Sequence, residues 1–153
     1  MNDQWLEPDI HEAEEYIDKK PAPDGDYTLN IQSAPRFKMS KAGTPYLEWF
    51  LTHTGGNTKF IPVFERTMLS GKGAFRHFQL LNALGYTNEE IKATFKYRAM
   101  APLTQENAKQ GVPCELMLKG EKFTPMGKTL RAKLKTETGE DGTDRNVVAQ
   151  FKK

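Results

Sequence analysis

Residues 26 to 66 have the sequence DYTLNIQSAPRFKMSKAGTPYLEWFLTHTGGNTKFIPVFER. Apolar side chains recur there at every second position in three runs, which is the alternation expected of β-strands with one buried face. In the first run Tyr27, Leu29 and Ile31 alternate with polar residues, so this strand is expected to cover a core. We therefore expect successive strands that the rest of the chain closes into one domain.

A basic loop and a tight turn separate the runs. The loop of residues 36–45 holds three cations and an aromatic ring, and its glycine and proline favour a change of direction. The pair Gly55-Gly56 is a typical two-residue hairpin turn. That turn would pair Leu51 with Phe60. Counting outward from it predicts these core-facing residues: Leu47, Trp49, Leu51, Phe60, Pro62 and Phe64.

The outer face of this predicted hairpin carries Phe50 opposite Ile61 and Thr52 opposite Lys59. Ligand binding is one explanation for an aromatic ring that is exposed on a strand. A bulge of one residue would exchange the two faces and expose Trp49 in place of Phe50. We expect Trp49 in the core.

The composition favours a single soluble domain. A chain of 153 residues is long enough for one domain with its own core, and 37% of its residues are hydrophobic. No apolar run approaches the roughly 20 residues that cross a bilayer, and the acidic N-terminus is unlike a signal peptide. We expect a soluble cytoplasmic protein without a membrane partner. Cys114 is the only cysteine, which excludes an internal disulfide and a thiolate metal cluster.

Charge is distributed unevenly along the chain. Residues 1–20 hold seven acids and two lysines, a net charge of −5, whereas residues 21–136 hold seventeen bases and nine acids, a net charge of +8. Residues 137–153 have a net charge of −1. A basic body with an acidic arm suggests a surface for a polyanion, although an ordinary solvated surface can carry the same totals.

Three segments follow from this pattern. Residues 1–24 are predicted to be an acidic arm and linker, residues 25–136 the folded domain, and residues 137–153 a polar tail with a candidate edge strand at 145–151. The arm either forms a short helix from Trp5 to Lys20, with acids early and lysines late as the helix dipole favours, or stays flexible.

Helices and further strands are predicted between the linker and the tail. Residues 71–85 favour an amphipathic helix with Ser70 as N-cap and Gly85 as its C-terminal stop. The predicted buried stripe of this helix is Ala74, Phe75, Phe78, Leu81, Leu84 and Gly85. Residues 88–97 favour a second helical segment, and residues 105–111 a loop.

Two later strands, at residues 114–119 and 129–135, alternate apolar and polar side chains, and the second is basic on its outer face. The loop between them, residues 120–127, carries Phe123 as an expected exposed ring beside cations.

The predicted order of three strands, a helix and two strands is that of an OB-fold, a five-stranded Greek-key barrel. OB-folds bind oligonucleotides or oligosaccharides over strands 2 and 3 and the loops joining strands 1 to 2 and 4 to 5. Both of those loops are basic and aromatic in this chain. We therefore expect a mainly β OB-fold, with an amphipathic helix between its third and fourth strands, that binds nucleic acid.

Five motifs also carry a family resemblance: GDYTLNI (25–31), SKAGTPYLEWFL (40–51), GKGAFRHFQLLNALG (71–85), GVPCELMLKGEKF (111–123) and KTLRAKLKTE (128–137). In their order and spacing, over about residues 25–136, the chain resembles phage-encoded single-stranded DNA-binding proteins of the OB-fold class. The resemblance implies sequence-tolerant protection of single strands during phage DNA replication or recombination in the host cytoplasm, with replication or recombination proteins as partners.

One departure from that family concerns the acidic tail. Many of its members end in an acidic tail that recruits partners and competes for the DNA groove, whereas this sequence ends Phe151-Lys152-Lys153 and is acidic at the other end. Either the N-terminal arm competes for the groove by charge mimicry, or it packs on the barrel or binds another replication protein.

By position, the resemblance assigns Arg36, Lys38 and Lys41 to a first basic loop, Tyr46 and Phe50 to the surface of the second strand, and Lys122 and Phe123 to a late loop. Cations of this kind displace counterions from phosphates, and aromatic rings stack on bases of any identity. The complete set of candidate nucleic-acid-binding residues is Arg36, Phe37, Lys38, Lys41, Tyr46, Phe50, Lys59, Lys122, Phe123, Lys128, Arg131 and Lys133.

The patterns in the sequence that could suggest catalysis do not match known catalytic motifs. The fragment Ser70-Gly71-Lys72-Gly73 fails the phosphate-loop pattern at both ends, and the three histidines lack metal-ligand spacing. We expect no enzyme activity, cofactor or metal. The alternatives to DNA binding are an RNA-binding OB domain, which the sequence does not distinguish from one that binds DNA, and a phage structural or protein-interaction module. The sequence does not indicate the oligomeric state.

Overall fold

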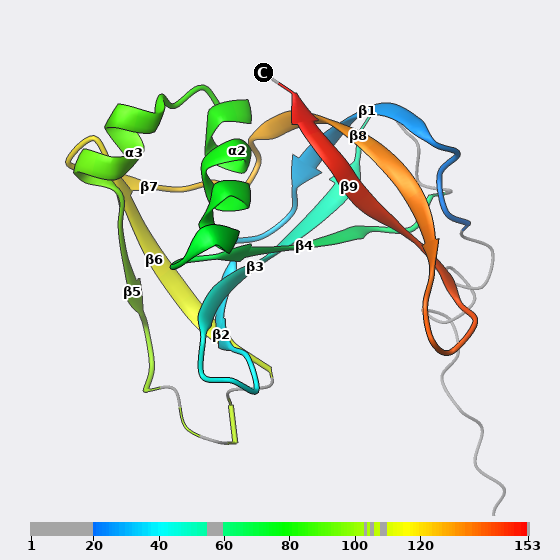
Figure 1. The fold of residues 1–153 in the computed structure, drawn as a ribbon. Coiled ribbons are helices and arrows are strands. Elements are labelled where there is room, and N and C mark those ends of the chain that lie inside the picture. Colours follow the sequence, from blue (N-terminus) through cyan, green and yellow to red (C-terminus); the bar gives the residue numbers. More distant parts are fainter. Residues whose placement is uncertain (1–19, 55–59, 103, 105, 108–109, 153) are drawn as a thin grey trace, which may run out of the picture.

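The computed structural model describes residues 20–54, 60–102, 104, 106–107 and 110–152, and Figure 1 shows their arrangement. These residues form one nine-stranded antiparallel sheet and two short α-helices, so the mainly β prediction is confirmed. Within the described part of the chain, no helix is long and apolar enough to cross a membrane.

The strands, in chain order, are β1 (Gly25–Ile31), β2 (Arg36–Met39), β3 (Pro45–His53), β4 (Val63–Met68), β5 (Lys96–Ala99), β6 (Val112–Leu118), β7 (Glu121–Phe123), β8 (Thr129–Thr138) and β9 (Asp144–Lys152). The helical segments are the 3-10 turn η1 (Lys72–Ala74) and the helices α2 (Phe75–Ala83) and α3 (Asn88–Thr94). The order across the sheet is β5-β6-β2-β3-β1-β8-β9, with β4 paired to β3 and β7 paired to β6.

The predicted basic loop contains a strand. Arg36–Met39 forms β2, which pairs with β3 on one side and with β6 on the other, so only residues 40–44 make the turn. The loop prediction was wrong because the cations and apolar residues alternate there, a pattern that a strand satisfies as well. β1 and β2 together form one interrupted strand, and both halves pair with β3.

The predicted register of the β3–β4 hairpin was wrong by three residues. The structure pairs Leu51 with Val63 and Trp49 with Glu65, whereas the two-residue turn required Leu51 opposite Phe60. A shift by an odd number exchanges the faces of the second strand. On β3 the predicted core side is confirmed, because Trp49 and its neighbours at 47 and 51 are fully buried.

On β4 the buried side chains are Val63, Glu65 and Thr67, and Phe64 points outward. Phe60 and Pro62, predicted to face the core from the strand, lie outside β4. Pro62 has no backbone N–H to contribute to the ladder, and Phe60 instead forms a parallel bridge with Lys20. The predicted turn residues 55–59 lie outside the described residues.

Helix α2 covers the core with a side that matches the predicted stripe in part: Leu81 is buried, and Phe78 and Leu84 pack against the core as predicted. Its buried residues are His77, Leu80 and Leu81, whereas Phe75 is 56% exposed. Ser70 is not the N-cap, because the 3-10 turn η1 precedes α2 and Ala74 takes the capping position. The predicted C-terminal stop at Gly85 is confirmed by a φ of 104°, a left-handed conformation that favours glycine.

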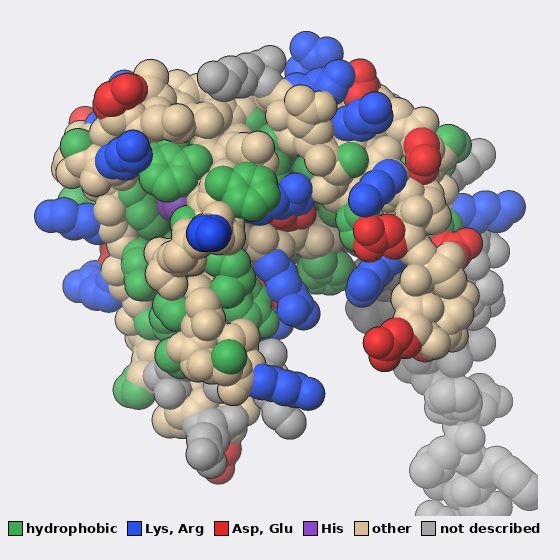
Figure 2. All heavy atoms as spheres, in the orientation of Figure 1, with side chains coloured by type: hydrophobic (Ala, Val, Ile, Leu, Met, Phe, Trp, Pro, Cys, Tyr) green, Lys and Arg blue, Asp and Glu red, His purple; other side chains and the backbone are tan. Residues whose placement is uncertain are grey.

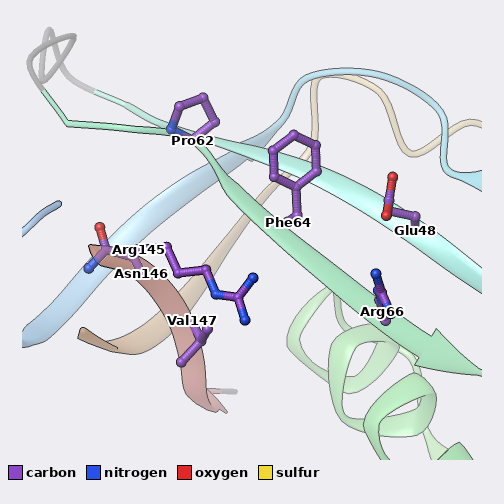
Figure 3. Close-up of a pocket in the computed structure, with 7 residues that line it drawn as sticks. All are labelled: Glu48, Pro62, Phe64, Arg66, Arg145, Asn146 and Val147. Carbon is purple, nitrogen blue, oxygen red and sulfur yellow. The ribbon is translucent and has the colours of Figure 1, made fainter. Parts of the chain in front are cut away.

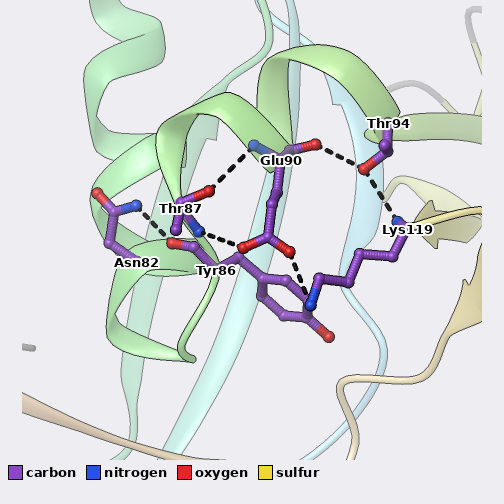
Figure 4. Close-up of polar contacts among 6 residues, drawn as sticks. All are labelled: Asn82, Tyr86, Thr87, Glu90, Thr94 and Lys119. Atoms are coloured by element: carbon purple, nitrogen blue, oxygen red, sulfur yellow. Dashed lines mark hydrogen bonds and ion pairs between the residues drawn. The ribbon is translucent and has the colours of Figure 1, made fainter.

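Helix α3 ends earlier than predicted and is tied to the β6–β7 hairpin (Figure 4). A capping box starts the helix, in which Thr87 and Glu90 bond each other's backbone N–H groups at 3.1 Å. Lys119, in the β6–β7 turn, pairs with Glu90 at 2.7 Å through Nζ and donates its backbone N–H to Thr94 Oγ1 at 2.9 Å. Phe95 then leaves the helical conformation, and the next residues pair with β6 as β5 rather than continuing a helix.

Arg76 of α2 joins β4 to β9, which no backbone ladder does among the described residues. Its guanidinium donates to Glu65 Oε1 of β4 at 2.5 and 2.8 Å and to the carbonyl of Val148 in β9 at 3.0 Å. The candidate edge strand at 145–151 is confirmed as β9. Because its partner β8 runs to Thr138, that pairing continues past the predicted boundary at residue 136.

Candidate nucleic-acid interface

Two aromatic rings lie side by side on the outer face of β3 and β4. Phe50 and Phe64 are directly paired in the ladder, with ring centroids 5.1 Å apart and ring planes 43° from parallel. Phe64 is 60% exposed and Phe50 is half-buried. The alternation that buries Trp49 and Glu65 on the opposite face directs both rings outward.

A groove of about 570 Å³ runs beside Phe64, between β4 and β9 (Figure 3). Its lining residues are Glu48, Pro62, Phe64, Arg66, Arg145, Asn146 and Val147. Arg66 comes from β4 and Arg145 from β9, so guanidinium groups from distant parts of the chain flank one exposed ring. Figure 2 shows this side of the molecule hollowed between the β2–β5–β6 region and the β8–β9 hairpin, with lysine and arginine side chains around the hollow.

Hydrogen bonds of a buried asparagine fix the β9 side of the groove. The side chain of Asn146 accepts from the backbone N–H of Ala22 at 2.7 Å and donates to its carbonyl at 2.9 Å. Close by, the carbonyl of Lys20 accepts from the backbone N–H of Ile61 at 3.0 Å. The segment before β1 is therefore held between the start of β9 and the residues that lead into β4, which fixes the backbone that carries Arg145.

The charged groups of this outer face leave an excess of cations. Glu48 is the carboxylate in the groove lining, and Lys38 of β2 pairs with it at 2.8 Å. Arg66 lies over the ring of Tyr46, with its guanidinium carbon 5.3 Å from the ring centroid. Because Lys38 compensates Glu48, the charge of Arg66 remains available for an anionic ligand. Arg145 lies opposite Glu137 in the β8–β9 ladder and adds a second cation at the groove.

Four of the candidate residues predicted from the sequence belong to this outer face: Arg36, Lys38, Tyr46 and Phe50. Tyr46 is only 8% exposed, because Arg66 lies over its ring, and thus offers little surface for a base. The Lys38 side chain is also largely buried, in its pair with Glu48. Lys41 is exposed in the turn between β2 and β3. Lys59 lies outside the described residues.

Two predicted exposed rings are placed elsewhere. Phe37 points to the opposite face of β2 from its basic neighbours and stacks on Tyr97 of β5, at 5.6 Å between ring centroids. Phe123 is 6% exposed and packs in the core against Tyr86. The expectation of an exposed Phe123 was wrong because β7 begins directly after a two-residue turn and pairs Phe123 with the buried Leu116.

The remaining candidates are exposed cations away from the groove lining. Lys122 lies on β7, and Lys128 Nζ lies 5.9 Å from the centre of the Phe123 ring. Arg131 and Lys133 point outward from β8, as the alternation predicted. They lie near an ion pair between Lys152 and Asp26 on the flanking strands, at 2.7 Å.

Sequence reasoning missed three residues of the groove: Phe64, Arg66 and Arg145. Phe64 was assigned to the core by the wrong register, and the same error concealed that Arg66 shares its face. Pro62 was the signal available in the sequence. Because strand ladders avoid proline, the second strand should begin after Pro62, and the connection between the two strands should then be longer than two residues. Arg145 is brought to the groove by the β8–β9 pairing. The signal was the Asp141-Gly142 turn, because it joins the predicted edge strand at 145–151 to the strand before it as a hairpin.

Buried titratable groups lie outside the groove lining. Burial lowers the pKa of His77 to about 4, and neither of its ring nitrogens has a hydrogen-bond partner. Burial also raises the pKa of the Cys114 thiol. No cluster of three metal-ligating side chains occurs among the residues that the structure describes.

No known family model matches the chain, and comparison with curated proteins finds no significant match. The geometry and chemistry of these residues therefore provide the basis for a function.

Proposed function

We propose that this protein binds single-stranded nucleic acid, without strong sequence preference, across the outer face of β3 and β4. The observation that carries the proposal is the exposed pair of Phe50 and Phe64 beside a groove whose two sides contribute Arg66 and Arg145. Exposed rings offer faces on which bases stack, and the guanidinium groups bind phosphates. Bases in a duplex are already stacked and paired, so this combination favours single strands.

We also propose that the sheet is an elaborated OB-fold. In that interpretation β1 and β2 form the first strand, and β3, β4, β6 and β8 are the other four. The interrupted first strand supports it, because β1 pairs with β8 and β2 pairs with β6 while both pair with β3. The helices lie between β4 and β6, as expected between the third and fourth strands, and β5, β7 and β9 are additions. The candidate interface then coincides with the strand 2–3 surface that OB-folds use.

Single-stranded DNA is the proposed ligand, in phage replication or recombination as the family resemblance implies, and no catalytic role is included. An RNA-binding protein remains the second candidate, because stacking and phosphate contacts serve both polymers. A structural or protein-interaction module is less favoured, since it would not need arginines beside an exposed ring.

A polarisation titration with labelled single-stranded DNA, duplex DNA and RNA of equal length, at several salt concentrations, tests the proposal. We expect the single strands to bind more tightly than the duplex. Log K should fall with log salt by about 0.7 for each phosphate contacted. Equal affinity for duplex DNA, or no binding at low salt, would contradict the proposal.

Arginine variants test the location of the site in the same assay. Arg66→Ala and Arg145→Ala should each lower the salt slope by about 0.7 if each contacts one phosphate. Lys92→Ala, which removes an exposed cation of α3, is the matched control and should leave the slope unchanged. Equal effects of all three substitutions would mean that binding follows total charge rather than this groove.

A further inference from the structure

We infer that a second surface, the β5–β6–β7 patch, extends the nucleic-acid site, so that long single strands contact it and short ones do not. We define the patch as Lys96 and Arg98 of β5, Met117 and Glu115 of β6, and Lys122 of β7. The inference rests on the proposed function, since it concerns the length of strand that the same protein binds.

The ladder registers bring the members of the patch together on one face. Met117 pairs with Lys96 on one side and with Lys122 on the other, so cations from both neighbouring strands flank an exposed thioether. Two residues earlier on β6, Glu115 pairs with Arg98 of β5 and lies on the same face as Met117. Met117 is 39% exposed, and a cavity of about 350 Å³ lies over these residues. The patch therefore has the same combination of apolar centre and cationic sides as the main groove.

Charges on the patch do not cancel. Glu115 is its carboxylate, and both Arg98 and Lys122 pair with it, the latter at 3.7 Å. Three cations therefore face one carboxylate. The Arg98 contact uses only Nη2 toward Glu115, and its side chain is 74% exposed, so most of the five guanidinium donors point to solvent. Lys96 is exposed too, and a phosphate approaching the patch meets a net positive surface.

Tyr97 of β5 borders the patch from the opposite face of the sheet, because it pairs with the buried Leu116 rather than with Met117 or Glu115. It is 42% exposed and lies between Lys96 and Arg98 on β5. Phe37 stacks beneath it with only 28° between the ring planes, and Phe95 lies at 6.3 Å on a second side. Contacts with Phe37 and Phe95 hold the Tyr97 ring on that face, so the apolar contact that the patch itself offers is the Met117 thioether.

The patch and the main groove are connected through β2. This strand lies between β3 and β6, and its Arg36 pairs with Glu48 on one side and with Pro113 on the other. Four strand spacings separate β4 from β5 across β3, β2 and β6, which corresponds to roughly 19 Å along the sheet. A strand of a few nucleotides can occupy only one of the two surfaces, whereas a longer strand can reach both by passing Arg36.

Oligonucleotide length separates the two surfaces experimentally. We would measure the affinity of the full chain for oligo-dT of about 5 and about 20 nucleotides, one near the lower limit and one beyond the upper limit of the roughly 4 to 16 nucleotides that an OB domain binds. The test variant combines Lys96→Ala with Lys122→Ala, which keeps the Arg98–Glu115 pair. The matched control combines Lys92→Ala with Lys72→Ala, exposed cations of α3 and η1 outside the patch and the main groove.

For the 20-nucleotide strand, we expect the test variant to lower the salt slope by about 1.4, which corresponds to about 25-fold weaker binding at 0.1 M salt. The 5-nucleotide strand should bind the test variant and the control alike. A second variant, Met117→Ser, should weaken binding of the long strand without changing the slope, because it removes apolar contact and no charge.

Unchanged binding of the long strand by both the double variant and Met117→Ser would overturn the inference and leave the main groove intact. Equal weakening for short and long strands would overturn it as well, since the patch would then not extend the site. Failure of the wild-type protein to bind either strand would instead refute the proposed function itself.

Discussion

Trp49 and Phe50 are neighbours in sequence with opposite roles. Trp49 is fully buried, and its indole N–H donates to Thr67 Oγ1 at 2.8 Å, so its polar group is satisfied inside the core. Phe50 points to the other face and contacts Phe64. The period of two in a strand therefore separates a residue that stabilises the fold from one that is available to a ligand.

We predict that Phe64→Ala and Phe50→Ala weaken the binding of single strands by roughly 1 to 3 kcal/mol each, the usual contribution of a ring that stacks on a base. The salt slope should stay nearly constant because no charge is removed. Trp49→Ala should instead lower the free energy of unfolding by roughly 3 to 5 kcal/mol, the usual cost of emptying a buried aromatic site. Titration and urea unfolding distinguish the two effects. A stable Trp49→Ala protein with impaired binding would contradict this division of roles.

At the scale of residues, the sequence predicted one face of a hairpin better than the other. The alternation in β3 identified Trp49 as a core residue and Phe50 as an outward ring. Phe64 and Phe123 were both assigned to the wrong environment, because each depends on a cross-strand register set by the length of a turn. Alternation within one strand is a local property, whereas register depends on pairing with a second strand.

At the scale of elements, long periodic segments were predictable and short ones were not. The segments that form β1, β3, α2, β6 and β8 have clear periods, and all were found near their expected positions. β2, β5 and β7 have three or four residues each, too few to distinguish a strand from a loop by pattern. They exist because longer strands offer them ladder partners.

We predict that the contact between Arg76 and Glu65 is essential for the packing of α2 against β4 and β9. Arg76→Met should cost about 3 kcal/mol, because it leaves the Glu65 carboxylate buried without a partner. Burial already raises the pKa of Glu65 despite the adjacent guanidinium, so its charge is costly to bury alone. The double variant Arg76→Met with Glu65→Leu removes both charges and should regain most of the loss in urea unfolding. If the double variant is no more stable than Arg76→Met, the unpaired carboxylate is not the cause.

For the molecule as a whole, we predict a loss of stability in acid that depends on His77. Burial lowers its pKa to about 4 from an ordinary 6.5, so the unfolded state binds a proton more readily than the folded state. The free energy of unfolding is therefore highest above pH 6.5, where His77 is neutral in both states. It falls by up to about 3 kcal/mol as the pH falls from 6.5 toward 4. Urea unfolding between pH 4 and pH 7 measures this slope.

His77→Leu should flatten that pH dependence whatever its effect on stability at pH 7. His53 contributes in the same direction, because burial lowers its pKa too, and Glu65 contributes in the opposite direction. The comparison of His77→Leu with the wild-type protein isolates the imidazole from both. An unchanged slope in the variant would show that His77 is not the group responsible.

The acidic arm is attached close to the groove. Residues 1–19 lie outside the described residues, and their seven acids and one lysine give a net charge of −6. They join the described chain at Lys20, whose carbonyl accepts a hydrogen bond from the backbone N–H of Ile61. Two residues later, Ala22 is hydrogen-bonded to the groove residue Asn146. A chain of 19 residues has a contour length of about 60 Å, which is long enough for a tethered acidic segment to reach Arg66 and Arg145.

We predict that this arm competes with nucleic acid for the groove. Deleting residues 1–19 should tighten the binding of single strands at low salt, and the difference should shrink as salt screens the arm. A variant that keeps the length of the arm but carries Gln or Asn in place of its seven acids should match the deletion, because competition by charge needs the carboxylates and not the chain. Polarisation titrations of the three proteins at several salt concentrations test this. Unchanged affinity of the truncated protein at every salt concentration would exclude competition, and tighter binding by the deletion alone would mean that the arm obstructs the groove by its bulk rather than by its charge.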